Sequence, residues 1–82
     1  MEKVKINISA RHVHLTREAI LKLFGHELHV RNYLNQVGQF AAEETVTLKT
    51  DKWTIENVRI IGPARKYNQV EISKYDARKF GI

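Results

Sequence analysis

Alternation of apolar and polar residues, more than any other feature, limits the folds open to this chain. From Lys3 to Ser9 the two kinds alternate strictly, so every second side chain would lie on one apolar face of an extended strand. The two-residue period returns in "ETVTLKT", "WTIENVRII" and "QVEIS", at residues 44–50, 53–61 and 69–73. These stretches predict a chain that is mainly β.

Two stretches have the pattern of short helices. "LTREAILKLFG", residues 15–25, offers Thr16 as an N-cap and Gly25 as a left-handed stop. A second helix is predicted from Ser73 to Phe80, where Ser73 and Asp76 stand in capping-box-like positions and Gly81 ends the pattern. The apolar stripe of the first helix would consist of Ala19, Ile20, Leu23 and Phe24.

The rest of the chain predicts turns and irregular segments. Residues 26–37 have no clean period and indicate a small hairpin or flap. Asp51 and Lys52 predict a tight turn between two paired strands. In the second of these strands the apolar residues expected to face inward are at odd positions before Asn57 and at even positions after it. This change predicts a β-bulge near Asn57.

Size and composition bound the fold and its chemistry. The chain has 82 residues and no cysteine, so it predicts one small domain, residues 1–82, with neither a disulfide nor a thiolate metal site. Five or six strands with two short helices suit a small β-barrel with short capping helices. Any metal must be bound by histidine or carboxylate side chains.

The stretch "SARHVHL", residues 9–15, contains two histidines that an extended backbone would place on one face. His12 and His14 would then lie within reach of a single cation. A His-x-His pair alone is more often an ordinary polar strand end, because Zn²⁺ usually takes three or four protein ligands. The best third ligand is Glu71, which the alternation of "QVEIS" turns away from the core, toward either solvent or a site.

Other titratable residues carry a weaker signal. His26 and His29 are alternative third ligands for the His12 and His14 pair, but they lie in the irregular segment and are interpreted as surface residues. Glu43 and Glu44 flank the start of a predicted strand and are interpreted as a solvated edge.

The loop "GPARKY" is a candidate phosphate contact. Gly62 and Pro63 predict a turn that throws Arg65 and Lys66 outward, and the planar fork of arginine matches two phosphate oxygens. An ordinary charged loop is the alternative. Together, a His-x-His pair, a carboxylate and an arginine would suit a metal that polarises or positions an oxyanion.

The charge balance favours anionic partners. Fourteen Lys and Arg against nine Asp and Glu give a net charge of +5. An alternative function is therefore a basic nucleic-acid-binding module that stacks bases on Tyr33, Trp53 and Tyr67, although no RNP-type motif is present. No apolar run has the length of a membrane span and "MEKVKINIS" lacks the features of a signal peptide, so we expect a cytoplasmic protein without membrane contact.

Four segments in order carry a family resemblance. "SARHVHLT", "GQFAAEETVTL", "VRIIGPARK" and "QVEIS" resemble the amino-terminal half of the PduL-type phosphate propanoyltransferases, phosphotransacylases of propanediol-degrading and related bacteria. The likeness runs from Lys5 to Ile82. It implies reversible transfer of a propanoyl or acetyl group between coenzyme A and phosphate, with acyl phosphate as product. It also implies paired β-barrels with helical caps and an active site between them that holds two divalent metals, taken to be zinc.

The resemblance assigns roles to individual residues. It implies that His12, His14 and Glu71 bind one metal and that Arg65 contacts phosphate. Because the chain has no cysteine and no serine in a nucleophile-elbow sequence, we predict direct attack of bound phosphate on the thioester. Residues expected near coenzyme A are the backbone of Ile8, Ser9 and Ala10 and the side chains of Lys52 and Arg59.

The chain departs from the family in what it lacks. The family's second half supplies another His-x-His and a further histidine for the second metal, and neither is present. We therefore expect a second barrel from a separate carboxy-terminal half or from a homodimer partner, or else a non-catalytic fragment that assembles with the missing half. Some family members carry an extension that directs them to a bacterial microcompartment; this chain starts at its first strand, which predicts the cytoplasmic form.

Overall fold

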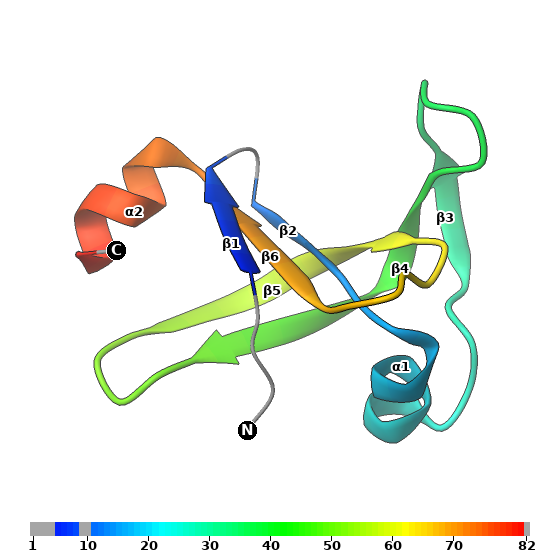
Figure 1. Ribbon diagram of the computed structural model, residues 1–82, viewed down its shortest axis with the longest axis horizontal. Coiled ribbons are helices and arrows are strands. Elements are labelled where there is room, and N and C mark those ends of the chain that lie inside the picture. The colour runs from blue at the N-terminus through cyan, green and yellow to red at the C-terminus, as the bar shows by residue number, and fades with distance from the viewer. Residues whose placement is uncertain (1–4, 9–10, 82) are drawn as a thin grey trace.

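The computed structural model describes residues 5–8 and 11–81 of the chain. It contains six strands and two short helices, which confirms the prediction of a mainly β fold (Figure 1). In chain order the elements are β1 (Lys5–Ile8), β2 (His12–His14), α1 (Arg17–Phe24), β3 (Val30–Tyr33), β4 (Phe40–Lys49), β5 (Thr54–Gly62), β6 (Gln69–Ile72) and α2 (Lys74–Phe80).

The strands form one mixed sheet in the order β1-β6-β2-β5-β4-β3. β1 runs parallel to β6 and β2 runs parallel to β5, whereas the other neighbours are antiparallel. Within the described ranges the two edge strands, β1 and β3, do not pair with each other. The sheet is therefore open, and the closed barrel predicted from the sequence is not confirmed.

Both helices begin and end where the sequence predicts. Thr16 accepts a hydrogen bond from the backbone N–H of Ala19 at 3.1 Å, and Gly25 closes α1 with a left-handed φ of 73°. The predicted apolar stripe is too wide, however. Leu23 is 59% exposed and Ile20 is the one buried residue of α1, because this short helix turns a single narrow side toward the sheet.

The hairpins follow the predictions for the middle of the chain. The irregular segment of residues 26–37 contains β3, which pairs antiparallel with β4, so the hairpin extends beyond that segment to Lys49. Asn57 has a positive φ of 57°, and the pairing of β4 with β5 shifts register between Val46 and Leu48. These two observations confirm the predicted bulge.

A small core joins β2, β4 and β5. Its buried members are Val13, Ala42, Ile55, Val58 and Ile60. Trp53 and Phe80 pack beside this cluster with ring centroids 5.5 Å apart, which attaches α2 to the sheet. Neither helix in the described part of the chain is long and apolar enough to span a bilayer.

An ion pair attaches the start of β2 to α2. Arg11 donates through Nε to Asp76 Oδ2 at 2.8 Å, and its Nη2 contacts the other carboxylate oxygen. Asp76 is only 1% exposed, and its backbone N–H donates to the Oγ of Ser73, the N-cap of α2. The hydrogen bond from Arg11 outweighs the effect of burial and lowers the pKa of Asp76 to about 2.

We expect Asp76→Asn to lower the free energy of unfolding at neutral pH by on the order of 2 kcal/mol, because Arg11 loses its charged partner. Asp76 titrates near 3.9 when unfolded and near 2 when folded, so its stabilisation is present above about pH 4 and disappears as the pH falls through about 2. Urea unfolding of both proteins across this range measures the difference. Asp51→Asn, in the exposed β4–β5 turn, is the control, and a gap between wild type and Asp76→Asn that does not change with pH would contradict the assignment.

Candidate metal and phosphate site

The pairing of β2 with β6 places the predicted ligands on one face of the sheet. His12 lies directly opposite Glu71, and His14 lies opposite Gln69. Val13, between the histidines, points to the other face and is 1% exposed in the core. Burial of Val13 therefore determines the direction in which both imidazoles project.

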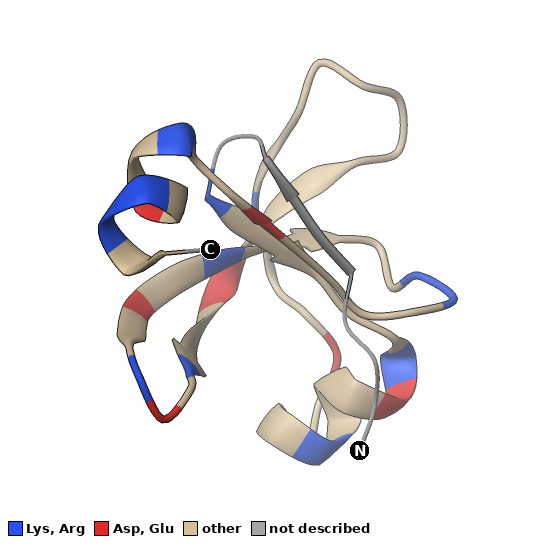
Figure 2. Ribbon diagram, turned by 60° about the vertical axis from the view of Figure 1, so that its left-hand side comes forward, with Lys and Arg blue, Asp and Glu red and all other residues tan. Residues whose placement is uncertain are grey.

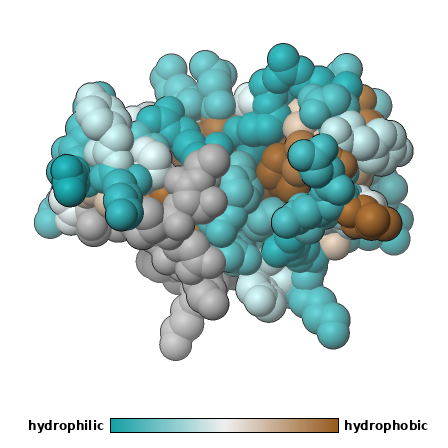
Figure 3. Space-filling view, turned by 90° about the horizontal axis from the view of Figure 1, so that it is seen from above, coloured by the Kyte–Doolittle hydropathy of each residue, from teal (hydrophilic) through white to brown (hydrophobic). Residues whose placement is uncertain are grey.

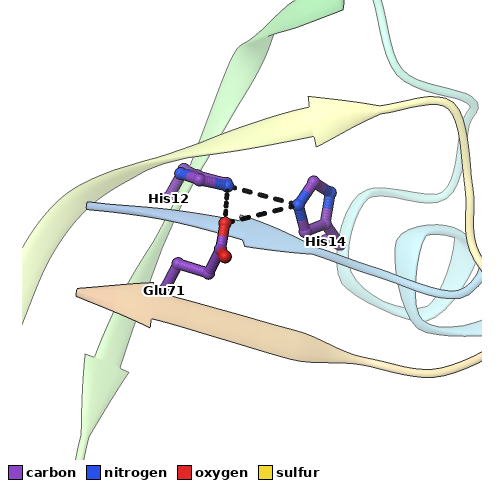
Figure 4. Close-up of side chains that lie close together, drawn as sticks. All are labelled: His12, His14 and Glu71. Atoms are coloured by element: carbon purple, nitrogen blue, oxygen red, sulfur yellow. Dashed lines mark hydrogen bonds and ion pairs between the residues drawn. The ribbon is translucent and has the colours of Figure 1, made fainter. Parts of the chain in front are cut away.

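The three side chains converge on a small volume (Figure 4). The Nε2 atoms of His12 and His14 are 3.2 Å apart, and Glu71 Oε2 contacts the first and lies 3.7 Å from the second. Ligand atoms around a tetrahedral zinc ion are separated by roughly 3.4 Å, given metal–ligand distances near 2.0–2.1 Å. The spacing of these atoms is suitable for one divalent cation.

The environment of His14 favours the form that binds metals. Its Nδ1 lies 3.3 Å from the carbonyl oxygen of Ile61, a contact that orients Nε2 toward Glu71. Burial lowers the pKa of His14, and electrostatic interaction with the nearby Arg65 and His12 side chains lowers it further. A neutral imidazole is the state that coordinates a metal.

Arg65 lines the same cavity as the three potential ligands. The cavity has a volume of about 430 Å³ and is also lined by Gln69 and Ile61. Arg65 is exposed on the β5–β6 loop, one of the basic segments in Figure 2. Further lining residues come from the turn between β3 and β4, namely Leu34, Gln36 and Gln39.

Two hydrogen bonds hold the loop that carries Arg65. The backbone N–H of Arg65 donates to the carbonyl of Leu15 at 2.8 Å, and the N–H of Thr16 donates to Asn68 Oδ1 at 2.9 Å. At the start of the loop, Gly62 faces Phe40 so closely that a Cβ atom would overlap its ring. The loop is thus anchored to the connection between β2 and α1.

The two basic side chains predicted near coenzyme A, Lys52 and Arg59, are not among the residues that line this cavity. Lys52 is exposed in the β4–β5 turn. Arg59 neighbours His12 across the parallel pairing, but its Nη1 donates to the carbonyls of Ala42 and Glu43, both at 3.0 Å. Ile8 is the last residue of β1, and Ser9 and Ala10 lie outside the described residues.

Some residues at the cavity were missed by sequence reasoning. Gln69 is 8% exposed and lies two residues before Glu71 on β6, so both side chains project to the same face of the sheet. This spacing in the sequence could have predicted its place at the cavity. The residues of the β3–β4 turn carried no such signal, because their position depends on how that hairpin folds over the sheet.

A second group of titratable side chains differs from its prediction. His26 and His29 are largely exposed, as expected, but the Glu44 side chain is 10% exposed and accepts a hydrogen bond from His29 Nδ1 at 2.6 Å. The prediction of a solvated Glu44 was therefore wrong. Burial alone would raise the pKa of Glu44, but hydrogen bonds from His29 lower it overall.

Comparison with known proteins assigns the chain to a family. The family model described as phosphate propanoyltransferase matches residues 5–82. The chain belongs to the phosphate propanoyltransferase family. It corresponds to the amino-terminal part of that family, as the recognised segments indicated.

Relatives named phosphate propanoyltransferase come from diverse bacteria. The protein of Thermotoga maritima is 52% identical over 79 residues, which cover 94% of this chain and 38% of that protein. Identity to the protein of Alkaliphilus metalliredigens is 49% over 82 residues, or 98% of this chain and 39% of the relative. For the protein of Salmonella typhimurium the identity is 46% over 80 residues, with coverages of 96% and 38%. The chain thus spans less than two-fifths of the length of these relatives.

We expect Gly62→Ala to destabilise the fold by about 1–3 kcal/mol, because the new methyl group overlaps the Phe40 ring. Thermal unfolding measures the loss. Combining it with Phe40→Leu provides the control: a smaller side chain at position 40 relieves the overlap, so the double variant should lose less than the sum of the single losses. Strict additivity of the two losses would show that the overlap is not the cause.

Proposed function

We propose that this chain supplies the amino-terminal half of the active site of a metal-dependent enzyme that transfers an acyl group, propanoyl or acetyl, between coenzyme A and phosphate. One observation carries the proposal. In a chain that matches the phosphate propanoyltransferase model over residues 5–82, three potential metal ligands and an arginine line the same cavity.

The donor set of His12, His14 and Glu71 suits zinc. Two imidazoles and one carboxylate are three protein ligands, and catalytic zinc sites commonly keep the fourth position for water or substrate. A bound zinc ion would supply Lewis-acid polarisation of an oxygen of the substrate. The chain's own contribution is to hold the ligands on one rigid sheet face, with the His14 ring fixed by the Ile61 carbonyl.

Arg65 is the proposed phosphate-positioning residue. Its guanidinium can hold two phosphate oxygens at once, and its charge offsets the repulsion between phosphate and Glu71. We propose direct attack: a phosphate oxygen bonds to the thioester carbonyl carbon and the carbon–sulfur bond breaks. The thiolate of coenzyme A leaves and takes a proton from solvent.

Coenzyme A binding is the second part of the proposal. Lys52, Arg59 and the backbone from Ile8 to Ala10 stay predictions that rest on the family resemblance. The net charge of +5 favours approach of an anionic substrate, and basic residues lie on α2, on the β4–β5 turn and on the β5–β6 loop (Figure 2).

We further propose that residues 1–82 form one domain that pairs with a second barrel, from a carboxy-terminal half or from a second copy. The length of the relatives supports this pairing, since this chain covers 38% of the first two. Apolar residues at the β3–β4 hairpin also support it: Tyr33 is 72% exposed and Val37 is 102% exposed. Figure 3 shows apolar surface gathered on the side where this hairpin lies, within a mostly hydrophilic exterior.

For the metal, we expect Glu71→Gln to weaken zinc binding at the β2–β6 site by roughly tenfold or more, because the anionic ligand is lost while the side-chain shape is kept. Competition with a chromophoric chelator measures the affinity. Glu56→Gln, an exposed carboxylate on β5, is the matched control and should bind zinc like wild type. Unchanged zinc affinity in Glu71→Gln would remove the metal role.

For phosphate, we expect Arg65→Gln to weaken phosphate binding to the zinc-loaded chain by roughly tenfold or more, through loss of the bidentate contact. Lys66→Gln, the next residue of the same loop, removes the same charge and should have a much smaller effect. Calorimetric titration with inorganic phosphate gives the affinities, and release of coenzyme A from propanoyl-CoA reports the transfer. Equal effects of the two variants would indicate general charge attraction and not positioning by Arg65.

The nucleic-acid alternative is tested in parallel. Trp53 is half-buried against Phe80, which disfavours it as a base-stacking platform. Salt-sensitive binding of oligonucleotides without binding of coenzyme A would support that alternative over acyl transfer.

A further inference from the structure

A second cluster of potential metal ligands lies outside the proposed acyl-transfer site. His26 and His29 lie on the connection between α1 and β3, and Glu44 projects from β4. One nitrogen or oxygen of each lies within 4.8 Å of the others. None of the three lines the cavity that holds Arg65.

The carboxylate of Glu44 is held in place by the chain. It accepts from the backbone N–H of His29 through Oε1 at 2.9 Å and from the imidazole of His29 through Oε2 at 2.6 Å. Its side chain is 10% exposed, and its strand, β4, lies between β5 and β3 in the sheet. The anionic ligand is therefore already oriented and largely desolvated.

The second histidine faces the same carboxylate without bonding to it. His26 Nδ1 lies 4.0 Å from Glu44 Oε2, and the ring centroids of the two histidines are 4.8 Å apart. His26 Nδ1 also lies 2.8 Å from the carbonyl oxygen of Glu27. The nitrogen that faces Glu44 is therefore the one that contacts this carbonyl, and Nδ1 of His26 must exchange the Glu27 contact for the ion when a cation binds.

We propose that His26, His29 and Glu44 form a second binding site for a zinc-class divalent cation, which clips the α1–β3 connection to β4. Two histidines and one glutamate are a known three-ligand set for zinc, and the exposed side of the cluster leaves a fourth position to water. The ion takes the place of the proton between His29 Nδ1 and Glu44 Oε2, and His26 completes the set.

Such a clip would hold an exposed edge strand in place. Every residue of the edge strand β3 is exposed, so little apolar burial holds this strand in place. The backbone hydrogen bond from Glu43 N–H to the His29 carbonyl, at 2.8 Å, connects the same two segments. In a chain of 82 residues with no disulfide, a bound metal is one of the few additional cross-links available.

The competing explanation is that His29 and Glu44 form only a hydrogen-bonded pair, without a metal. A variant of His26 distinguishes these two explanations. His26 is beyond hydrogen-bond distance of Glu44, so His26→Gln should leave the melting temperature of the metal-free chain nearly unchanged. If the cluster binds zinc, the same variant removes one ligand. Zinc affinity should then fall by roughly tenfold or more, without loss of the fold.

The experiment uses the Glu71→Gln chain, in which the first site is weakened, with and without His26→Gln. Chelator competition, circular dichroism and the absorption of bound Co²⁺ are measured on both. We expect Glu71→Gln to bind about one equivalent of zinc with a rise in melting temperature on the order of 10 °C at zinc concentrations near 100 times Kd. Adding His26→Gln should reduce that rise by about half or more at the same zinc concentration.

The adjacent Glu43→Gln is the control and should retain the zinc-dependent rise, because Glu43 is exposed and is not part of the cluster. No zinc binding in Glu71→Gln, or equal binding with and without His26→Gln, would overturn the proposal. Neither outcome depends on whether His12 and His14 bind zinc. That question is tested separately, by comparing the zinc affinity of wild type with that of Glu71→Gln.

Discussion

The antiparallel pairing of β2 with β6 is the constraint on which the site depends. β2 has only three residues, and its central residue, Val13, is buried in the core, so both histidines must point to the opposite face. The register then brings Glu71 opposite His12. A slip of one residue would send the histidines into the core and Val13 into the cavity.

The same short strand connects the site to the rest of the molecule. β2 lies between β5 and β6, and it is parallel to the first and antiparallel to the second. Arg11, just before β2, is paired with the buried Asp76 of α2, and Leu15, just after it, accepts a hydrogen bond from Arg65. The residues on either side of the potential metal ligands thus fix one helix and the phosphate-binding loop proposed above.

The two histidine–carboxylate clusters suit different tasks. His14 is 4% exposed and lines a cavity with an arginine, which fits a site where substrate displaces water. His26 and His29 are about half exposed, and they connect an edge strand to its neighbour, which fits a structural clip. The family resemblance assigns metal-binding roles to the first cluster only. The second cluster is proposed from its geometry.

The sequence by itself determined the strands other than β3, the helix caps, the bulge at Asn57 and the shared face of His12 and His14, because these depend on local periodicity and backbone preference. Four recognisable segments also determined the family. Only the tertiary structure decided that the sheet stays open among the described residues, that Asp76 pairs with Arg11, and that Glu44 meets His29. The Arg11–Asp76 pair joins residues 65 positions apart, and the His29–Glu44 pair joins residues 15 positions apart. No periodic pattern in the sequence specifies which distant side chains the folded sheet will bring together.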